Sequence, residues 1–303
     1  MTVTPQLSEE VEAALRHGRP VVALETTLVS HGFPGAQGVQ VALAAEARVR
    51  RAGAVPATIG IMDGAVRAGL TPAELERFAS AGPEARKAGP RDLAACVVQG
   101  TLGATTVGGT LAVCRLAGIA FMATGGTGGV HRRFAESLDI SADLPQIART
   151  RALVVSSGVK SILDVPATAE LLETLGVPVL GWRTGTLPLF YGVAGGPPVS
   201  AVVTAAKEAA LIIAAHWQLN GSTGVLLARP PEPSLEIEPV IAEAVARVES
   251  QGVRGQSVTP AVLALVHELT GGRSAEVNRQ LIEDNAGLAA EVAVAYSAAA
   301  ADG

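Results

Sequence analysis

The sequence predicts an α/β protein, with a three-layer α/β/α arrangement around a central, mostly parallel mixed sheet. Short, continuously apolar runs alternate along the chain with longer helical segments. Such runs are typical of strands that helices cover on both faces. The composition agrees, because 49% of the 303 residues are hydrophobic, 17% are charged and the mean hydropathy is +0.37. This is enough apolar material for a large core.

Six apolar runs are the expected strands. They are residues 20–28 (PVVALETTL), 55–62 (VPATIGIM), 119–124 (IAFMAT), 152–157 (ALVVSS), 177–182 (VPVLGW) and 224–229 (GVLLAR). Between them, Thr71-Pro72-Ala73-Glu74 has the spacing of a helix capping box with proline at the first helical position. Thr259-Pro260 predicts a second helix that starts with a cap followed by proline.

The last third of the chain is expected to be helical. The proline-rich residues 230–233 follow the last strand, and helical sequence runs from Ile237 to Ala300. We expect this part, about residues 235–300, to pack on the same body, so that residues 1–303 form a single domain. A separate helical domain is the alternative.

Charge and hydropathy exclude several classes of protein. The net charge is −5 and no basic stripe occurs, so no nucleic-acid partner is expected. Residues 1–20 lack the apolar segment of a signal peptide, and no apolar stretch reaches the roughly 18 residues of a membrane span. We therefore expect a cytoplasmic protein with no membrane partner. Cys96 and Cys114 are expected to be buried and unpaired.

Polar residues follow several of the expected strands, and α/β sheets bind their ligands at these strand ends. We expect a carboxylate, a lysine and a glycine-rich loop to meet there in one crevice. The polar residues are Glu25, Asp63, residues 124–129, Lys160, Arg183 and Thr184.

Glu25 and Lys160 carry the expected catalytic chemistry. Glu25 interrupts an apolar strand, and burial raises the pKa of a carboxyl group, as a general acid near neutral pH requires. A structural ion pair is the alternative for Glu25. Lys160 has the apolar neighbours Val159 and Ile162, and partial desolvation favours its neutral amine, a nucleophile for a sugar carbon. The alternative is a lysine that reaches solvent or pairs with Asp164.

The stretch TGGTGGVHRR (residues 124–133) predicts an anion site. Its glycines let backbone N–H groups approach a phosphate, and His131 or Arg132 adds positive charge. Lys87 and Arg91 are cations that could join this site, and a surface turn is the alternative. No Walker or dinucleotide fingerprint is present, so an ATP or NAD site has weak support.

Asp143, with Asp139 four residues earlier, is a candidate ligand for a hard metal ion. The histidines and cysteines lack the spacing of a zinc site. A Mg²⁺ or Mn²⁺ ion held by one or two carboxylates and water fits better. The alternative is that Asp139 caps a turn.

Taken together, these residues resemble a known family. ALETTLVSHGFP (23–34), PATIGIMDG (56–64), DISADLPQIART (139–150), SSGVKSILD (156–164) and IEDNAGLAAEVA (282–293) are similar to segments of the pseudouridine-5′-phosphate glycosidases, a family that includes the indigoidine synthase A-like proteins. The resemblance runs in one order from about residue 7 to about residue 297.

The resemblance implies an α/β/α homotrimer that cleaves the C–C glycosidic bond of pseudouridine 5′-phosphate to uracil and ribose 5-phosphate with bound Mn²⁺. It implies that Lys160 forms an imine with C1′ of the sugar, that Glu25 is the acid/base group and that Asp143 holds the metal through water. The implied substrate-binding residues are Lys87, Thr106, Val107, Thr124, Gly125, Gly126, His131, Ser141 and Asn285.

The sequence departs from the family pattern in several loops. Residues 87–92 (KAGPRD) lack the usual serine, residues 31–36 read HGFPGA, and residues 192–201 (GVAGGPPVSA) lack an expected arginine. None of these changes affects Glu25, Asp143 or Lys160. Two alternatives remain: an enzyme for a different sugar phosphate or C-nucleoside, and an oligomeric protein that binds such a ligand without catalysis.

Overall fold

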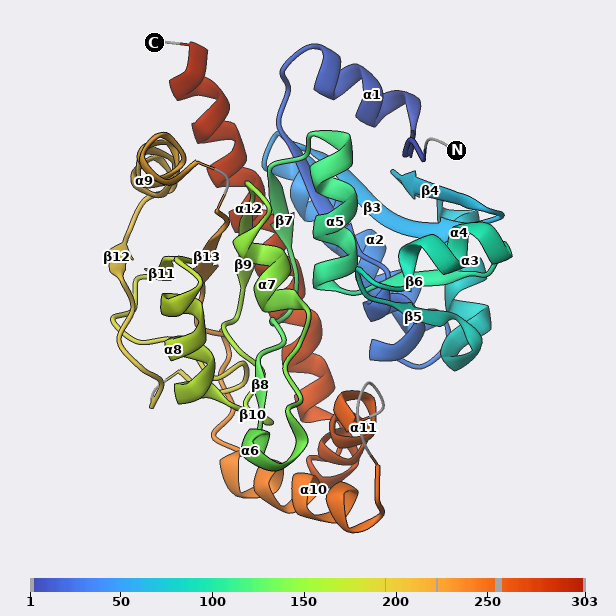
Figure 1. Cartoon of the computed structure of the whole chain (residues 1–303), viewed down its shortest axis with the longest axis vertical. Coiled ribbons are helices and arrows are strands. Elements are labelled where there is room, and N and C mark those ends of the chain that lie inside the picture. Colours follow the sequence, from blue (N-terminus) through green and yellow to red (C-terminus); the bar gives the residue numbers. More distant parts are fainter. Residues whose placement is uncertain (1–2, 194, 222, 254–257, 302–303) are drawn as a thin grey trace.

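The central sheet of the computed structural model is mixed and mostly parallel, as the sequence predicts (Figure 1). The structure describes residues 3–193, 195–221, 223–253 and 258–301. The sheet has 11 strands in the order β1-β4-β3-β2-β7-β9-β13-β11-β12, with β6 pairing with β3 and β5 pairing with β6. Its strands are β1 (Gln6–Leu7), β2 (Val21–Glu25), β3 (Val55–Met62), β4 (Ala65–Ala68), β5 (Arg86–Ala88), β6 (Gly103–Thr105), β7 (Phe121–Ala123), β9 (Leu153–Ser156), β11 (Val179–Trp182), β12 (Ala201–Val203) and β13 (Val225–Ala228).

All pairings along the path from β3 through β2, β7, β9, β13 and β11 to β12 are parallel, whereas β3 pairs with β4 and β6 in antiparallel fashion. The six predicted strands are all present. The strands that the sequence did not indicate are two to four residues long, too short to produce a recognisable pattern. They include a separate two-stranded antiparallel pair, β8 (Val130–His131) with β10 (Leu163–Asp164).

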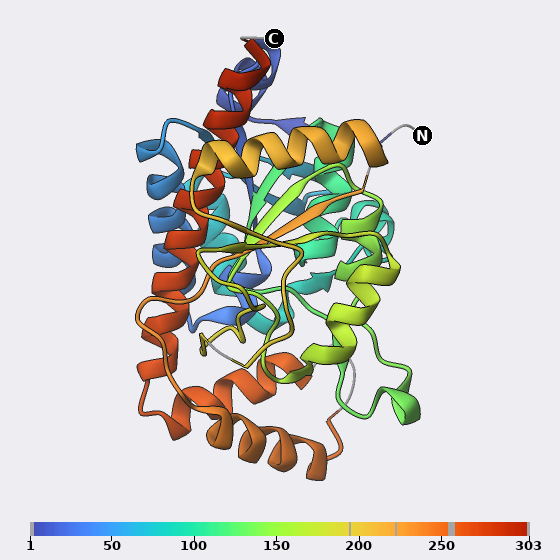
Figure 2. The same cartoon turned by 90° about the vertical axis from the view of Figure 1, so that its left-hand side faces the viewer.

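Helices cover both faces of the sheet, which gives the three predicted layers (Figure 2). On one face α2 packs against β3, and α12 packs against α2, β2, β7 and β9. On the other face α5 packs against β2 and β3 and contacts α7. The helices are α1 (Glu9–Arg16), α2 (Ala36–Arg51), α3 (Pro72–Ala81), α4 (Leu93–Gln99), α5 (Val107–Ala117), α6 (Phe134–Ser137), α7 (Asp143–Ala148), α8 (Val165–Thr174), α9 (Ala206–Asn220), α10 (Glu238–Ser250), α11 (Val258–Leu269) and α12 (Arg273–Ala301).

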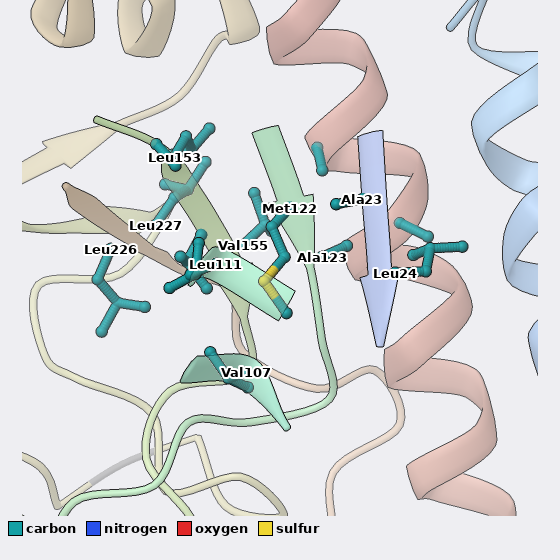
Figure 3. Close-up of a cluster of buried hydrophobic side chains, with 14 of the residues drawn as sticks. Ala23, Leu24, Val107, Leu111, Met122, Ala123, Leu153, Val155, Leu226 and Leu227 are labelled. Atoms are coloured by element: carbon teal, nitrogen blue, oxygen red, sulfur yellow. The ribbon is translucent and has the colours of Figure 1, made fainter. Parts of the chain in front are cut away.

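The core lies between these layers, because strands covered on both faces bury every residue. In Figure 3, side chains of β7, β9 and β13, such as Met122, Val155 and Leu227, gather with Val107 and Leu111 of α5. All five are at most 2% exposed. Burial of side chains this size contributes roughly 1.5–3 kcal/mol each. This packing fixes the positions of the strand ends that carry the polar residues.

The start signals of the helices were right in one case and wrong in another. Thr71 Oγ1 accepts a hydrogen bond from Glu74 N (3.3 Å) and the Glu74 carboxylate accepts one from Thr71 N (2.8 Å), which completes the predicted capping box of α3. Thr259 is not a cap, because α11 already begins at Val258 and Thr259 lies inside its first turn. The residue before Val258 lies outside the described residues.

The C-terminal helices share the hydrophobic cluster of the sheet. Ile241 of α10, Val262 of α11 and Ala289 of α12 belong to the same buried cluster as Val22 and Val154 of the strands. This packing supports the prediction that about residues 235–300 join the same body. Cys96 and Cys114 are free and buried, as expected. Within the described residues, no helix is long and apolar enough to cross a bilayer.

Candidate active site

A cavity of about 680 Å³ opens at the carboxyl ends of β2, β7 and β9. Its lining comes from the segments after these strands, from the start of α5 and of α7, and from α11 and α12. Every predicted catalytic and substrate-binding residue except Asn285 lines it, as does Asp143. These residues are Glu25, Lys87, Thr106, Val107, Thr124, Gly125, Gly126, His131, Ser141, Asp143 and Lys160.

Glu25 is the last residue of β2 and reaches the cavity from inside the sheet. It is 6% exposed, and Thr124, which follows β7, donates a hydrogen bond from Oγ1 to Glu25 Oε1. Burial raises the pKa of Glu25, whereas the charge of Lys160 and the Thr124 hydrogen bond lower it. The sum is a raised pKa, so Glu25 can hold a proton at higher pH than an ordinary glutamate.

Lys160 lies beyond the end of β9 because the chain turns sharply at Gly158. The φ angle of Gly158 is +80°, and a Cβ there would lie 2.0 Å from the carbonyl oxygen of Pro188, so only glycine fits. After the buried Val159, the backbone N–H of Lys160 donates to Thr127 O (3.4 Å), which joins this turn to the glycine loop. The Lys160 side chain is half-buried and lines the cavity.

Asp164 does not pair with Lys160, so the ion pair, one of the two structural alternatives for this lysine, is not found. Its Oδ1 accepts a hydrogen bond from Ala167 N (3.0 Å) and so caps the start of α8. Within the described residues no ion pair joins it to Lys160. The carboxyl group that the charge of Lys160 affects is that of Glu25, whose pKa this charge lowers.

Three backbone N–H groups of the glycine loop 124–129 already have hydrogen-bond partners, and one of them is Thr124 N, which donates to Val155 O (3.0 Å). Thr127 N donates to Gly158 O (3.1 Å), and Gly128 N donates to Asp143 Oδ2 (2.9 Å). The loop is therefore less available to an anion than its sequence suggests. Positive charge at the cavity comes instead from side chains, namely Lys87, Arg91, Arg149 and Lys160.

Asn285 is the one predicted substrate-binding residue that does not line the cavity. It is fully buried on α12, and its Nδ2 donates to the carbonyl oxygen of Thr124 (2.9 Å) and to Ser157 Oγ (3.1 Å). It therefore joins the residues that follow β7 and β9. These hydrogen bonds position the loop that carries Thr124, and a direct contact between Asn285 and the substrate stays a prediction.

Asp143 is a structural residue as well as a cavity residue. Its Oδ1 accepts a hydrogen bond from Gly108 N (2.8 Å) at the start of α5, and Oδ2 accepts from Gly128 N. It is 6% exposed. The charge of Asp143 thus joins a helix N-terminus to the glycine loop, where a negative group is favoured.

The donor set around Asp143 bears on the expected metal ion. Within the described residues no group of three or more His, Cys, Asp or Glu side chains is arranged to hold a metal ion. Each oxygen of Asp143 accepts one backbone hydrogen bond, and a carboxylate has about four acceptor positions. The residues therefore fit a hydrated ion held through water, and they do not fit a cage of protein ligands.

Lys87 of β5 and His131 of β8 also line the cavity. Burial lowers the pKa of Lys87, and the charge of Lys160 lowers it further. Burial also lowers the pKa of His131, against the influence of Asp139, whose carboxylate lies 3.9 Å from His131 Nδ1. Thr106 caps α5 by accepting a hydrogen bond from Gly109 N (3.1 Å).

Three polar residues at strand ends do not reach the cavity. Asp63 pairs with Arg77 at the surface (2.8 Å), because β3 turns back there into the antiparallel β4. Arg183 stacks on the Trp182 ring, with the guanidinium carbon 5.1 Å from the ring centroid, and it and Thr184 do not line the cavity. Arg132, in the expected anion site, donates to Ser161 O (2.8 Å) instead.

Sequence reasoning missed the wall that α11 and α12 contribute. Pro260, Leu263 and Asn278 line the cavity from these helices, together with Phe190. One signal was available for Asn278: it lies seven residues before Asn285, so the two amides share one face of a helix. Arg149, in the quoted DISADLPQIART segment, also lines the cavity.

The buried acid and the half-buried lysine give this cavity the parts for acid–base and nucleophilic chemistry on a sugar. Comparisons with known proteins identify the family of the chain. The sequence matches the family described as indigoidine synthase A like protein over residues 10–295. The pseudouridine-5′-phosphate glycosidase of Sorangium cellulosum (strain So ce56) is 47% identical over 296 residues, covering 96% of this chain and 93% of that protein. The enzyme of that name from Escherichia coli (strain K12) is 45% identical over 296 residues, covering 96% and 95%.

Two solved structures share the fold. The prealnumycin C-glycosynthase AlnA, crystallised in complex with ribulose 5-phosphate, is 41% identical, with a TM-score of 0.90 and 100% of both chains covered. An indigoidine synthase A-like protein from Thermotoga maritima is 35% identical, with a TM-score of 0.88 and 97% of both chains covered. With agreement in sequence and fold along nearly its whole length, the chain belongs to the indigoidine synthase A-like family, together with the pseudouridine-5′-phosphate glycosidases.

Proposed function

We propose that the protein cleaves the C–C glycosidic bond of pseudouridine 5′-phosphate, giving uracil and ribose 5-phosphate through an imine between Lys160 and C1′ of the sugar. One observation carries this proposal. The buried Glu25, with its raised pKa, and the half-buried Lys160 line the same cavity, close enough for the charge of Lys160 to act on Glu25. The names of the relatives supply the substrate class.

The bond to be broken explains why a lysine is needed. In an ordinary glycoside the departing electrons are stabilised on a heteroatom, and two carboxyl groups suffice. Here the leaving atom is C5 of uracil, so an electron source at C1′ is required. A neutral amine bonded to C1′ supplies that electron pair.

The proposed sequence balances protons and electrons. Protonated Glu25 gives its proton to the ring oxygen as the C1′–O bond breaks, and Lys160 Nζ forms a bond to C1′. The Glu25 carboxylate takes a proton from Nζ, which restores the nitrogen lone pair. That lone pair then forms a C=N bond while the C1′–C5 bond breaks, and the electron pair left on C5 takes the proton from Glu25. Water hydrolyses the imine, which releases ribose 5-phosphate and restores Lys160.

The 5′-phosphate is expected to meet the cationic side chains rather than the glycine loop alone. Lys87, Arg91 and Arg149 line the cavity, and three N–H groups of the loop already have partners. Guanidinium groups bind phosphate oxygens in a bidentate manner. This arrangement also compensates for the serine that residues 87–92 lack.

We propose Mn²⁺ as the cofactor, held through water on Asp143 with Asp139 as a second carboxylate at the cavity. Asp143 retains acceptor positions, and the Asp139 carboxylate is one-third exposed. The ion would supply electrostatic stabilisation and positioning of the sugar phosphate. Asp143 itself keeps the start of α5 and the glycine loop together whether or not the ion is bound.

A different C-glycoside is the second candidate. AlnA is named a C-glycosynthase and was crystallised with ribulose 5-phosphate. Residues 192–201 of this chain depart from the family pattern, and the described residues among them do not line the cavity. Comparing the release of uracil from pseudouridine 5′-phosphate with turnover of other C-glycosides separates the two candidates. A protein that binds without catalysis has no need for a lysine beside a buried acid, so we do not favour it.

Borohydride trapping tests the proposal. The sequence has three lysines, Lys87, Lys160 and Lys207, so the modified residue can be assigned without ambiguity. After incubation with ribose 5-phosphate and reduction, peptide mass spectrometry is expected to find the sugar adduct on Lys160. The Lys160→Ala variant should lose both adduct and turnover. Lys207→Ala, at an exposed position on α9, should keep both. An unmodified Lys160 in active enzyme would reject the imine route.

A homotrimer remains part of the proposal. The family resemblance is its basis, and the mass of one chain is 30.6 kDa. Light scattering in solution is expected to give three times this mass. A monomer with full activity would reject the trimer and leave the catalytic proposal in place.

A further inference from the structure

We propose that Asn278 of α12 recognises the base of the substrate, which makes it a specificity-determining residue of the cavity. This inference rests on the proposed function. Asn278 is 3% exposed and lines the cavity. Its Oδ1 is buried without a hydrogen-bond partner. Buried polar side chains nearly always have partners, so an unpaired amide oxygen on a residue that lines a cavity is a candidate for a hydrogen bond from a ligand.

The position of Asn278 is set by a close contact between α12 and the glycine loop. A Cβ on Gly125 would lie 3.2 Å from Ile282 Cγ1, 3.3 Å from Leu281 Cδ1 and 3.4 Å from Asn278 Oδ1. The absence of a side chain at Gly125 lets the helix approach the residue next to Thr124. Asn278 is therefore held near the acid end of the reaction centre, since Thr124 bonds to Glu25.

The surroundings of Asn278 differ from those of the cationic side chains. On the wall made by α11 and its neighbours, the lining residues include Pro260, Leu263 and Phe190. Phe190 is 2% exposed, and a Cβ on Gly126 would lie 2.5 Å from its ring. A wall of apolar and aromatic side chains suits a flat heterocycle and does not suit a phosphate.

The cations that suit a phosphate belong to other segments. Lys87 is on β5, Arg91 lies just before α4 and Arg149 just after α7. The cations and the amide of Asn278 thus come from different segments of the cavity lining. Pseudouridine 5′-phosphate carries both kinds of group that such a lining suits, a dianion and a neutral base.

The chemistry of a carboxamide matches uracil. The base presents N–H donors next to carbonyl acceptors, and an asparagine side chain offers one acceptor and two donors. The last side-chain torsion of asparagine has broad minima, so the amide can turn either its oxygen or its NH₂ group toward the base. A site built on such a hydrogen bond discriminates against a base that lacks the matching group.

The experiment measures product inhibition of the cleavage reaction by uracil and by ribose 5-phosphate separately. In Asn278→Ala and in Asn278→Leu, which is close to asparagine in size, the inhibition constant for uracil is expected to rise about tenfold, as for one lost hydrogen bond. The inhibition constant for ribose 5-phosphate should change less than about twofold. Gln280→Ala, on the same helix, is the matched control and should change neither constant.

Borohydride trapping of ribose 5-phosphate on Lys160 reports whether each variant is folded, because this step involves no base. Trapping at the wild-type level with a raised uracil constant supports base recognition. An unchanged uracil constant, or equal increases for both products, would overturn it and leave the proposed function standing. If the wild-type protein neither traps the sugar nor releases uracil, the proposed function itself fails.

Discussion

The hydroxyl group of Thr124 donates a hydrogen bond to Oε1 of Glu25, so the residue after β7 holds the carboxyl group at the end of β2. This bond opposes the effect of burial, which raises the pKa of Glu25. The charge of Lys160 acts in the same direction as the Thr124 bond. The protonation of the proposed acid therefore depends on two neighbours that can each be changed without altering the acid.

Thr124→Val is expected to raise the pKa of Glu25 further, because the hydrogen bond that lowers it is lost. In the proposed mechanism Glu25 acts in its protonated form, so activity falls as the pH rises through its pKa. The alkaline limb of the kcat/KM profile should therefore move to higher pH. Thr124→Ser keeps a hydroxyl group and should leave the limb near its wild-type position. A limb that moves to lower pH in Thr124→Val would contradict this assignment.

Glu25→Gln is expected to lower kcat by roughly 10²–10⁴-fold, the usual contribution of general acid–base catalysis. It should also change how stability depends on pH. Because the folded-state pKa of Glu25 is raised, the wild-type protein loses stability as pH rises from about 4.3, the unfolded value, through the folded pKa. The uncharged glutamine does not titrate. Urea unfolding across this range should show the free energy of unfolding of the variant rising relative to that of the wild type as the pH increases. A difference between the two that does not vary with pH would argue against a raised pKa.

Asp143→Asn is expected to destabilise the protein by about 1–3 kcal/mol, because an amide nitrogen would face one of the two backbone N–H groups that the carboxylate now satisfies. Asp139→Asn is the matched control. The Asp139 carboxylate lies 3.9 Å from His131 Nδ1. The backbone oxygen of Asp139 accepts a hydrogen bond from His131 N, and the variant keeps this bond. Urea unfolding separates the two variants. Mn²⁺ titration by calorimetry should show weaker binding in both, and unchanged Mn²⁺ binding in both would reject the proposed metal position.

Asn285→Ala is expected to destabilise the protein by about 1–3 kcal/mol, since the buried carbonyl oxygen of Thr124 and the hydroxyl oxygen of Ser157 lose the amide that donates to them. The variant should lose kcat more than it changes KM, because Asn285 positions the loop of Thr124 and does not line the cavity. Asn220→Ala, an exposed position at the end of α9, should change neither quantity. An increase in KM with kcat preserved would instead indicate direct contact between Asn285 and the substrate.

Local patterns were enough for much of the fold. The run VPATIGIM became β3, which is buried along its whole length, because a strand covered on both faces needs continuous apolar sequence. The capping box at Thr71 formed as its spacing required. Thr259-Pro260 was wrong as a cap because α11 already includes Val258, so Thr259 lies inside the helix and not before it. Short strands such as β6 arise from pairing with a neighbour and leave no periodic pattern.

For the site, the sequence by itself determined the chemical groups at strand ends, Glu25 and Lys160 among them, because an apolar run and the polar residue that ends it are adjacent in the chain. Only the tertiary structure decided which of these groups share a cavity. The neighbouring order β2-β7-β9 brings Glu25 and Lys160 together, whereas the antiparallel turn after β3 takes Asp63 to the surface. The packing of α12 on the glycine loop adds Asn278. Strand order and helix docking depend on contacts between residues far apart in sequence, and no local pattern contains them.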